Sequence, residues 1–184
     1  MFRLILVALL LLAGACTTGA GRIAPLAETG SSPYRLGTGD EVRVTVFGLD
    51  AANNSYVVGD TGMIAVPLLA PVAAAGKTVD ELQAALVQAI SARELLRAPS
   101  VSVQIQKYRP FFILGEVQRP GQYPFVPGMS VLAAVSTAGG FTFRADTKGM
   151  IVSRASGTAV IKGRAAPEAL VQPGDTINVL ESWF

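Results

Sequence analysis

The stretch from Phe111 to Tyr123 constrains the fold most strongly, because an uninterrupted apolar run leads directly into a tight turn. Phe111–Leu114 is apolar at every position, which is typical of a strand buried on both faces. Gly115 permits a bulge or a close backbone approach, and Arg119-Pro120-Gly121 places proline and glycine where a type II turn requires them. The stretch predicts a β-hairpin that continues to Val126. Its plainest interpretation is a core hairpin with no role beyond packing.

The first fifteen residues have the layout of a secretory signal peptide. Arg3 precedes the apolar run Leu4–Leu12, small residues follow, and the run is too short for a stable bilayer span. The only cysteine, Cys16, comes next and has no partner for an internal disulfide. We therefore assign residues 1–15 to a signal peptide and exclude them from the fold.

The segment that ends at Cys16 resembles the lipobox of bacterial lipoproteins. The residues that carry the resemblance are Leu12-Ala13-Gly14-Ala15-Cys16, with Ala13 where leucine is commonest. It implies diacylglycerol on the Cys16 thiol and an acylated amino terminus, and several acyl chains give stable anchoring. Thr17 in place of aspartate favours the outer membrane, by analogy with enterobacterial sorting. Residues 16–33 are predicted to be this lipidated cysteine and a flexible tether rich in small residues.

An α+β unit is predicted over residues 34–109. Val42, Val44 and Val46 alternate with polar residues, as in a half-buried strand, and Val101–Ile105 repeats that alternation. The segments 56–58 and 63–67 flank a turn and predict a hairpin, with Gly62 in a left-handed conformation.

A helix in this unit is predicted from a capping box. Thr78-Val79-Asp80-Glu81 opens it, its apolar residues share one face, and Pro99 ends any continuation. The helix is therefore expected to cover the strands.

A β-grasp unit is predicted over residues 110–184. After the hairpin, Ser130 caps a short helix that Gly139-Gly140 ends. Strands follow at 150–153 and 159–162, and the turn that contains Pro173 and Gly174 leads into a last strand at 176–180. A strand pair, a helix and further strands are the order of a β-grasp fold.

Composition excludes several classes of function. The formal net charge is +2 and falls to +1 without Arg3, and no block of basic residues exists, so nucleic acid is not an expected partner. The sequence has no histidine, and its one cysteine is expected to be acylated. Histidine bases, cysteine nucleophiles and metal sites built on either residue are therefore excluded, and no metal or other cofactor is expected.

Two remaining possibilities for chemistry have plainer explanations. Asp40, Glu41, Asp60 and Glu116 are candidates for a glycosidase carboxylate pair by residue type alone. Asp40 and Asp60 lie in predicted turns, where such side chains bond the backbone, and Glu116 lies at a strand end. Gly37-Thr38-Gly39 is followed by no helix or Gly-Lys-Ser/Thr ending, which disfavours phosphate binding. No catalytic residue and no enzymatic activity are predicted.

The ordered motifs resemble the bacterial outer-membrane polysaccharide export family. The residues that carry the resemblance in the first unit are Tyr34-Arg35-Leu36-Gly37-Thr38-Gly39-Asp40, Val58-Gly59-Asp60-Thr61-Gly62-Met63-Ile64, Val66-Pro67-Leu68, Gly76-Lys77-Thr78 and Ala98-Pro99-Ser100-Val101-Ser102-Val103. The second unit resembles the soluble-ligand-binding β-grasp (SLBB) module through Leu114-Gly115-Glu116-Val117, Arg119-Pro120-Gly121, Ala138-Gly139-Gly140-Phe141 and Pro173-Gly174-Asp175-Thr176-Ile177. One departure is Ala70-Pro71, where the family often has glycine.

The resemblance implies a lipid-anchored component of a capsular polysaccharide or exopolysaccharide export machine, at the periplasmic face of the outer membrane. It further implies a homo-oligomeric ring that guides the polymer, an inner-membrane polysaccharide co-polymerase as partner and, as an option, a separate outer-membrane β-barrel porin. The sequence ends at Phe184 without the amphipathic helix of pore-forming members. We therefore expect a short family member that does not itself perforate the membrane.

Tyr108, Arg109 and Arg119 are the candidate contacts of the domain junction or the oligomer, with ordinary surface packing as the alternative. A second hypothesis has a different functional class. In it the protein is a monomeric envelope lipoprotein that binds glycan through the β-grasp module and serves as a tether or sensor.

Overall fold

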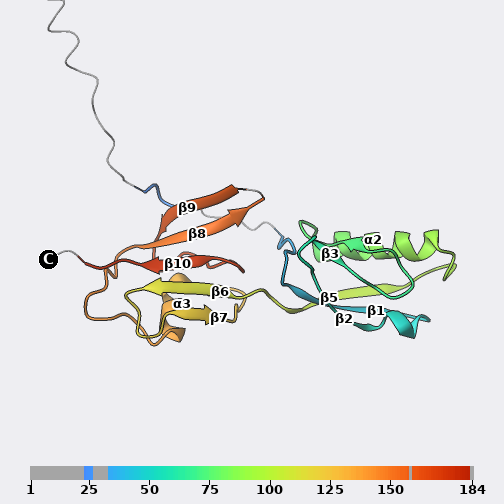
Figure 1. Cartoon of the computed structure of the whole chain (residues 1–184), viewed down its shortest axis with the longest axis horizontal. Helices are drawn as coiled ribbons and strands as arrows, with labels where there is room; N and C mark the ends of the chain where they lie inside the picture. Colours follow the sequence, from blue (N-terminus) through green and yellow to red (C-terminus); the bar gives the residue numbers. More distant parts are fainter. Residues whose placement is uncertain (1–22, 27–32, 158, 183–184) are drawn as a thin grey trace, which may run out of the picture.

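The computed structural model describes residues 23–26, 33–157 and 159–182, and these form two units side by side (Figure 1). The described residues contain two α-helices and ten strands, and the strands form three sheets. Each unit has its own cluster of buried hydrophobic residues. The predicted α+β fold class is confirmed. No helix in the described part of the chain combines the length and the apolar character that a membrane crossing requires.

The first unit has a three-stranded antiparallel sheet in the order β2-β1-β5. Val42, Val44 and Val46 of β1 are fully buried, so the predicted alternation is confirmed. A 3-10 helix, η1, connects β1 to β2, and helix α2 packs on β5. The bounds are β1 Glu41–Val46, η1 Asp50–Ala52, β2 Asn54–Val57, α2 Val79–Ala92 and β5 Val101–Lys107.

The capping box predicted for α2 is confirmed. The Thr78 hydroxyl accepts a hydrogen bond from the Glu81 backbone N–H, and the Glu81 carboxylate accepts one from the Thr78 N–H. These bonds satisfy two of the backbone donors that a helix start leaves unpaired. Leu82, Leu86 and Ile90 form the buried face of the helix.

The predicted hairpin of residues 56–58 with 63–67 is wrong in its pairing. Strand β2 pairs with β1, whereas β3 (Met63–Ile64) pairs with β4 (Val72–Ala73). Pro67 has no N–H to donate, so β3 cannot extend its ladder of hydrogen bonds through this residue. Gly62 nevertheless has a φ of 76°, and its carbonyl accepts hydrogen bonds from the N–H groups of Ala74 and Ala75.

The second unit has a five-stranded mixed sheet in the order β7-β6-β10-β8-β9. Strands β6 and β10 are parallel, and the other neighbours are antiparallel. Helix α3 contributes Val131, Ala134 and Val135 to the core, and the Ser130 hydroxyl caps its start. The bounds are β6 Phe111–Gly115, β7 Gly121–Tyr123, α3 Val131–Thr137, β8 Met150–Ser156, β9 Ala159–Ala165 and β10 Thr176–Val179.

The β6–β7 hairpin is confirmed, but burial of β6 on both faces is not. Phe111 and Ile113 are fully buried, whereas Phe112 and Leu114 are 40% and 49% exposed. The physical reason is that the hydrophobic cluster and α3 cover one face of the sheet, and the described residues place no second layer on the other. Gly115 provides the predicted close backbone approach, because a Cβ there would lie 2.0 Å from the Val179 carbonyl oxygen.

The connection between β6 and β7 differs from the predicted type II turn. Gly121 is the first residue of β7, and its φ of 159° borders on the extended region. The intervening loop instead reaches the end of α3, where the backbone N–H groups of Gln118 and Arg119 donate to the carbonyls of Gly140 and Ala138. These bonds fix the loop, so the chain reversal between β6 and β7 does not depend on a tight turn at Pro120-Gly121.

Residues 24–26 lie along β9, within the segment predicted to be a flexible tether. Pro25 forms a parallel bridge with Arg164. The prediction is therefore wrong for these three residues, because backbone hydrogen bonds join them to the sheet. Cys16, the predicted lipid anchor, and the predicted signal peptide lie outside the described residues.

Candidate functional site

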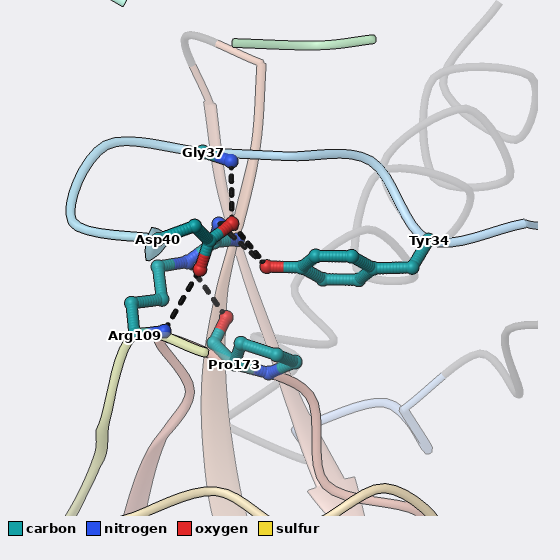
Figure 2. A network of polar contacts seen from close by, with 5 residues as sticks. All are labelled: Tyr34, Gly37, Asp40, Arg109 and Pro173. Carbon is teal, nitrogen blue, oxygen red and sulfur yellow. Dashed lines mark hydrogen bonds and ion pairs between the residues drawn. The ribbon is translucent and has the colours of Figure 1, made fainter. Parts of the chain in front are cut away.

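The most highly connected polar group between the two units is the Asp40 carboxylate, which is fully buried in the turn before β1 (Figure 2). Its Oδ1 atom accepts a 2.8 Å hydrogen bond from the Arg109 backbone N–H. Its Oδ2 atom accepts bonds of 2.7 Å from the Gly37 N–H and 2.6 Å from the Tyr34 hydroxyl. The fourth donor is Arg109 Nη1 at 3.1 Å. Four donors thus compensate for the removal of the carboxylate from water.

Arg109 extends this network into the second unit. It lies between β5 and β6, and its Nε atom donates to the Pro173 carbonyl at 3.0 Å, in the turn before β10. Its Nη1 atom also donates to the Tyr34 hydroxyl at 3.0 Å. One guanidinium therefore joins three segments that are far apart in the sequence, as Figure 2 shows.

The position of the guanidinium depends on two glycines. A Cβ at Gly37 would lie 2.0 Å from Arg109 Nη1, and one at Gly174 would lie 2.8 Å from Arg109 Nε. Gly174 also has a φ of 86°, which L-residues rarely adopt. The glycines on both sides leave the space that the arginine side chain occupies.

Aromatic rings continue the contact beside the arginine. The Tyr108 ring packs edge-on against Tyr34 and Phe125, with centroid distances of 5.1 and 5.3 Å. The Arg109 guanidinium carbon lies 5.8 Å from the Tyr34 ring centre, within cation–π range. Phe125 belongs to the second unit, so Tyr108 packs against both units.

Tyr34 acts in this network as a neutral hydroxyl. Burial is the main cause that raises its pKa well above the ordinary value of 10.0, and the hydrogen bond to Asp40 raises it further. The hydroxyl therefore keeps the proton that it donates to the carboxylate at physiological pH. The arrangement positions backbone segments, since every donor around Asp40 belongs to the chain itself.

The other carboxylates considered for catalysis make local contacts. Asp60 is exposed, and its Oδ1 atom accepts from the Thr61 N–H at 2.8 Å. Glu116 accepts from the Thr142 hydroxyl at 2.5 Å. Glu41 is the first residue of β1 and is partly exposed. Among the described residues, no group of three or more histidine, cysteine, aspartate or glutamate side chains could hold a metal ion.

The structure brings Tyr108 and Arg109 together at the junction but places Arg119 elsewhere. The Arg119 guanidinium contacts the Thr137 carbonyl at 3.4 Å, at the end of α3. Gly139 and Gly140, with φ of 87° each, end that helix. The remaining predicted turn residues lie as follows: Gly62 beside β3, Pro120 and Gly121 at the start of β7, and Pro173 and Gly174 beside the junction.

Sequence reasoning missed Tyr34 as a hydroxyl donor, Asp40 as the centre of the network and a second buried ion pair. In that pair, Arg154 Nε and Nη2 donate to the two Asp175 carboxylate oxygens at 2.9 and 2.7 Å. A signal for it existed. Met150 and Val152 occupy the inward positions of β8, and the same alternation places the charged Arg154 inward, where an acidic partner is required.

The two units match two different domain models. Residues 28–106 match the model described as polysaccharide biosynthesis/export protein, and residues 110–163 match the SLBB domain. Together the two matches cover more than half of the chain.

Named relatives match more than half of the chain. The chain is 37% identical over 147 residues to the exopolysaccharide production protein ExoF of Rhizobium meliloti, with 71% of this chain and 35% of the relative covered. It is 30% identical over 137 residues to the EPS I polysaccharide export outer membrane protein EpsA of Ralstonia solanacearum, with 60% and 36% covered. The chain thus spans about a third of the length of these relatives.

Proposed function

The chain belongs to the polysaccharide biosynthesis/export protein family, and we propose on this basis that it is a component of a bacterial machine that exports capsular polysaccharide or exopolysaccharide. The observation that carries the proposal is the order of the two matched domains, an export domain followed directly by an SLBB domain. The names of ExoF and EpsA support the same process. We assign residues 34–109 to the export domain and residues 110–184 to the SLBB domain.

In the proposed machine, the protein acts by binding and positioning and not by catalysis. The Asp40 carboxylate is saturated by donors from its own chain, and Arg109 is held by the Pro173 carbonyl. This junction keeps the export and SLBB domains in one arrangement, which a conduit for a long polymer requires.

The proposal includes lipidation at Cys16 and assembly into a homo-oligomeric ring at the periplasmic face of the outer membrane. Two exposed aromatic side chains, one on each domain, are the proposed contacts between copies: Phe47, after β1, is 85% exposed, and Phe143, between α3 and β8, is 92% exposed. In a closed ring each copy presents different patches to its two neighbours. The partners in this proposal are the polysaccharide, an inner-membrane co-polymerase and optionally an outer-membrane porin.

Gene deletion in the source bacterium tests the export role. The expected result is loss of polymer from the medium and its retention in the cell, with recovery when the wild-type gene is restored. Normal secretion by the deletion strain, together with saccharide binding by a purified monomer, would instead favour the glycan-binding lipoprotein.

Lipidation and ring formation need separate measurements. Labelling with a fatty-acid analogue should mark the wild-type protein and leave the Cys16→Ser variant unmarked. Electron microscopy of the purified lipidated protein should show rings, and Phe47→Asp should reduce their number. The surface variant Arg93→Ala serves as the control for a substitution in the same domain.

A further inference from the structure

Strand β9 is the edge of the five-stranded sheet, and the N-terminal part of the chain pairs with it. The Leu26 N–H donates to the Arg164 carbonyl at 2.8 Å, and the Arg164 N–H donates to the Ala24 carbonyl at 2.8 Å. Pro25, between them, has no N–H, but this parallel bridge needs none from it. Residues 24–26 therefore satisfy part of an edge that would otherwise present unpaired backbone groups.

Gly163 shows that β9 is shaped for this segment. A Cβ at Gly163 would lie 2.6 Å from the Leu26 Cα atom and 2.8 Å from its backbone nitrogen. Both of these are backbone atoms that a rotamer change cannot move. The φ of Gly163 lies outside the left-handed region, so the contact with Leu26, and not the backbone conformation, accounts for glycine here.

The Leu26 side chain provides a third contact. It is partly buried and packs against the hydrophobic cluster of the second unit. The site thus combines two backbone hydrogen bonds, a position without a side chain and an apolar contact, which are the elements of recognition by strand addition.

We propose that the β9 edge is a docking site for residues 24–26 of the same chain, and that this docking sets the distance between the N-terminal anchor and the SLBB domain. The statement about distance rests on the lipidation of Cys16 under the proposed function. The statement about docking does not depend on it.

The effect on reach follows from chain length. Seventeen residues lie between Cys16 and Tyr34, and they span at most about 60 Å when extended. With residues 24–26 docked, only residues 17–23 separate the anchor from β9, and these span at most about 25 Å. The docked segment therefore holds the β9 edge close to the membrane that carries the anchor.

A cysteine pair tests the docking. In a Cys16→Ser background, Pro25→Cys with Arg164→Cys places two thiols at opposed residues of paired strands, where a disulfide can close. We expect an intrachain disulfide on mild oxidation, visible as faster migration on a non-reducing gel. The control pair, Pro25→Cys with Gln122→Cys on β7 at the opposite edge, should remain reduced. A disulfide-linked dimer or no disulfide would overturn the proposal, because the occupant would then be a second copy or absent.

Gly163→Val tests the shape of the site in the same assay. The added side chain should displace Leu26 and lower the yield of the 25–164 disulfide by about tenfold, which corresponds to about 1.4 kcal/mol. Ala159→Val, at an exposed position of the same strand, should leave the yield unchanged. Leu26→Ser lowers the yield without altering β9 and replaces Gly163→Val if that variant does not fold. Equal yields in Gly163→Val, Leu26→Ser and the parent would overturn the proposal.

The distance between β9 and the membrane is tested by energy transfer in proteoliposomes. The lipidated protein carries a donor fluorophore on a cysteine that replaces Lys162 of β9, and the lipid headgroups carry the acceptors. Inserting about twelve Gly and Ser residues after Arg22 should lower energy transfer, whereas the same insertion after Gly30 should not. An equal decrease in energy transfer for both insertions would overturn the proposal that docking sets the distance. Failure of lipidation would appear as protein absent from the liposomes, which contradicts the proposed function and leaves the cysteine-pair result standing.

Discussion

Two turns in the molecule have the same hydrogen bonds but stabilise different parts of the structure. Asp40 follows Gly39, whose φ is 89°, and Asp175 follows Gly174, whose φ is 86°. Each aspartate accepts a 2.7 Å bond from the N–H three residues before it. Each also donates its own N–H to the carbonyl of that same residue, at 3.1 Å. The two turns lead into β1 and β10 and differ mainly in the arginine that each carboxylate pairs with.

The partner arginine determines what each turn stabilises. Asp175 pairs with Arg154 of β8, inside one sheet, and the two side chains are 1% and 10% exposed. Asp40 pairs with Arg109 from the connection between the units, which is 26% exposed. Because Arg109 also donates to the carbonyl of Pro173, which lies within the second turn, the first turn is connected to the second. The same turn structure therefore stabilises the core of the second unit at Asp175 and the joint between the two units at Asp40.

The largest effect is expected when the core pair is broken. Arg154→Ala leaves the Asp175 carboxylate buried without its bidentate partner and should lower the free energy of unfolding by about 3–5 kcal/mol. Chemical denaturation of the purified chain measures the change. Arg164→Ala, whose ion pair with Asp146 is long and partly exposed, should stay within about 0.5 kcal/mol. If Arg154→Ala lowers the free energy of unfolding by less than about 1 kcal/mol, the Arg154–Asp175 pair is not stronger than the Arg109–Asp40 pair.

Arg109→Ala should cost less and should change how the chain unfolds. Asp40 retains the N–H groups of Gly37 and residue 109 and the Tyr34 hydroxyl, so we expect a loss of about 2–3 kcal/mol. Calorimetry should show one transition for the wild type and two for Arg109→Ala, because the side-chain connection from Asp40 through Arg109 to Pro173 is lost. Arg119→Ala, in the β6–β7 loop, removes only a contact with the end of α3 and should preserve one transition. If Arg109→Ala also unfolds in one transition, the joint does not couple the units.

Glycine-to-alanine substitutions compare the two turns directly, because a glycine with positive φ precedes each aspartate. Gly174→Ala combines a positive φ with a contact 2.8 Å from Arg109 Nε and should cost about 2 kcal/mol. Gly39→Ala meets Arg109 Cβ at an ordinary 3.6 Å and should cost about 1 kcal/mol. Gly76→Ala, with a φ of 79° and no atom within 4 Å, measures the conformational cost alone. Melting temperatures that fall in the same order support the assignment of the excess at Gly174 to Arg109, and equal shifts at all three contradict it.

Local signals predicted the elements that depend on neighbouring residues. Thr78 and Glu81 are three residues apart, so the capping box of α2 was visible in the sequence, as was the alternation of β1. The tie at Asp40 was not visible, because its partner Arg109 lies 69 residues away. A turn signal also failed at Pro120-Gly121, where distant carbonyls at the end of α3 hold the loop. The sequence thus predicted local structure better than the contacts that join the units.

The smallest effect is expected from the Tyr34 hydroxyl, which donates to Asp40 and has no counterpart among the donors to Asp175. Tyr34→Phe removes the 2.6 Å bond to Asp40 and should cost about 1 kcal/mol near neutral pH. Because the folded state raises the pKa of Tyr34 above its ordinary value of 10.0, its contribution is complete below pH 10 and decreases at higher pH. The stability gap between wild type and Tyr34→Phe should therefore narrow as pH rises above 10. Burial also raises the pKa of Tyr56, but both proteins retain Tyr56, so its effect cancels. Denaturation curves at neutral pH and above pH 10 measure the gap, and a gap that widens with pH would mean that Tyr34 stabilises the joint as a phenolate and not as a donor.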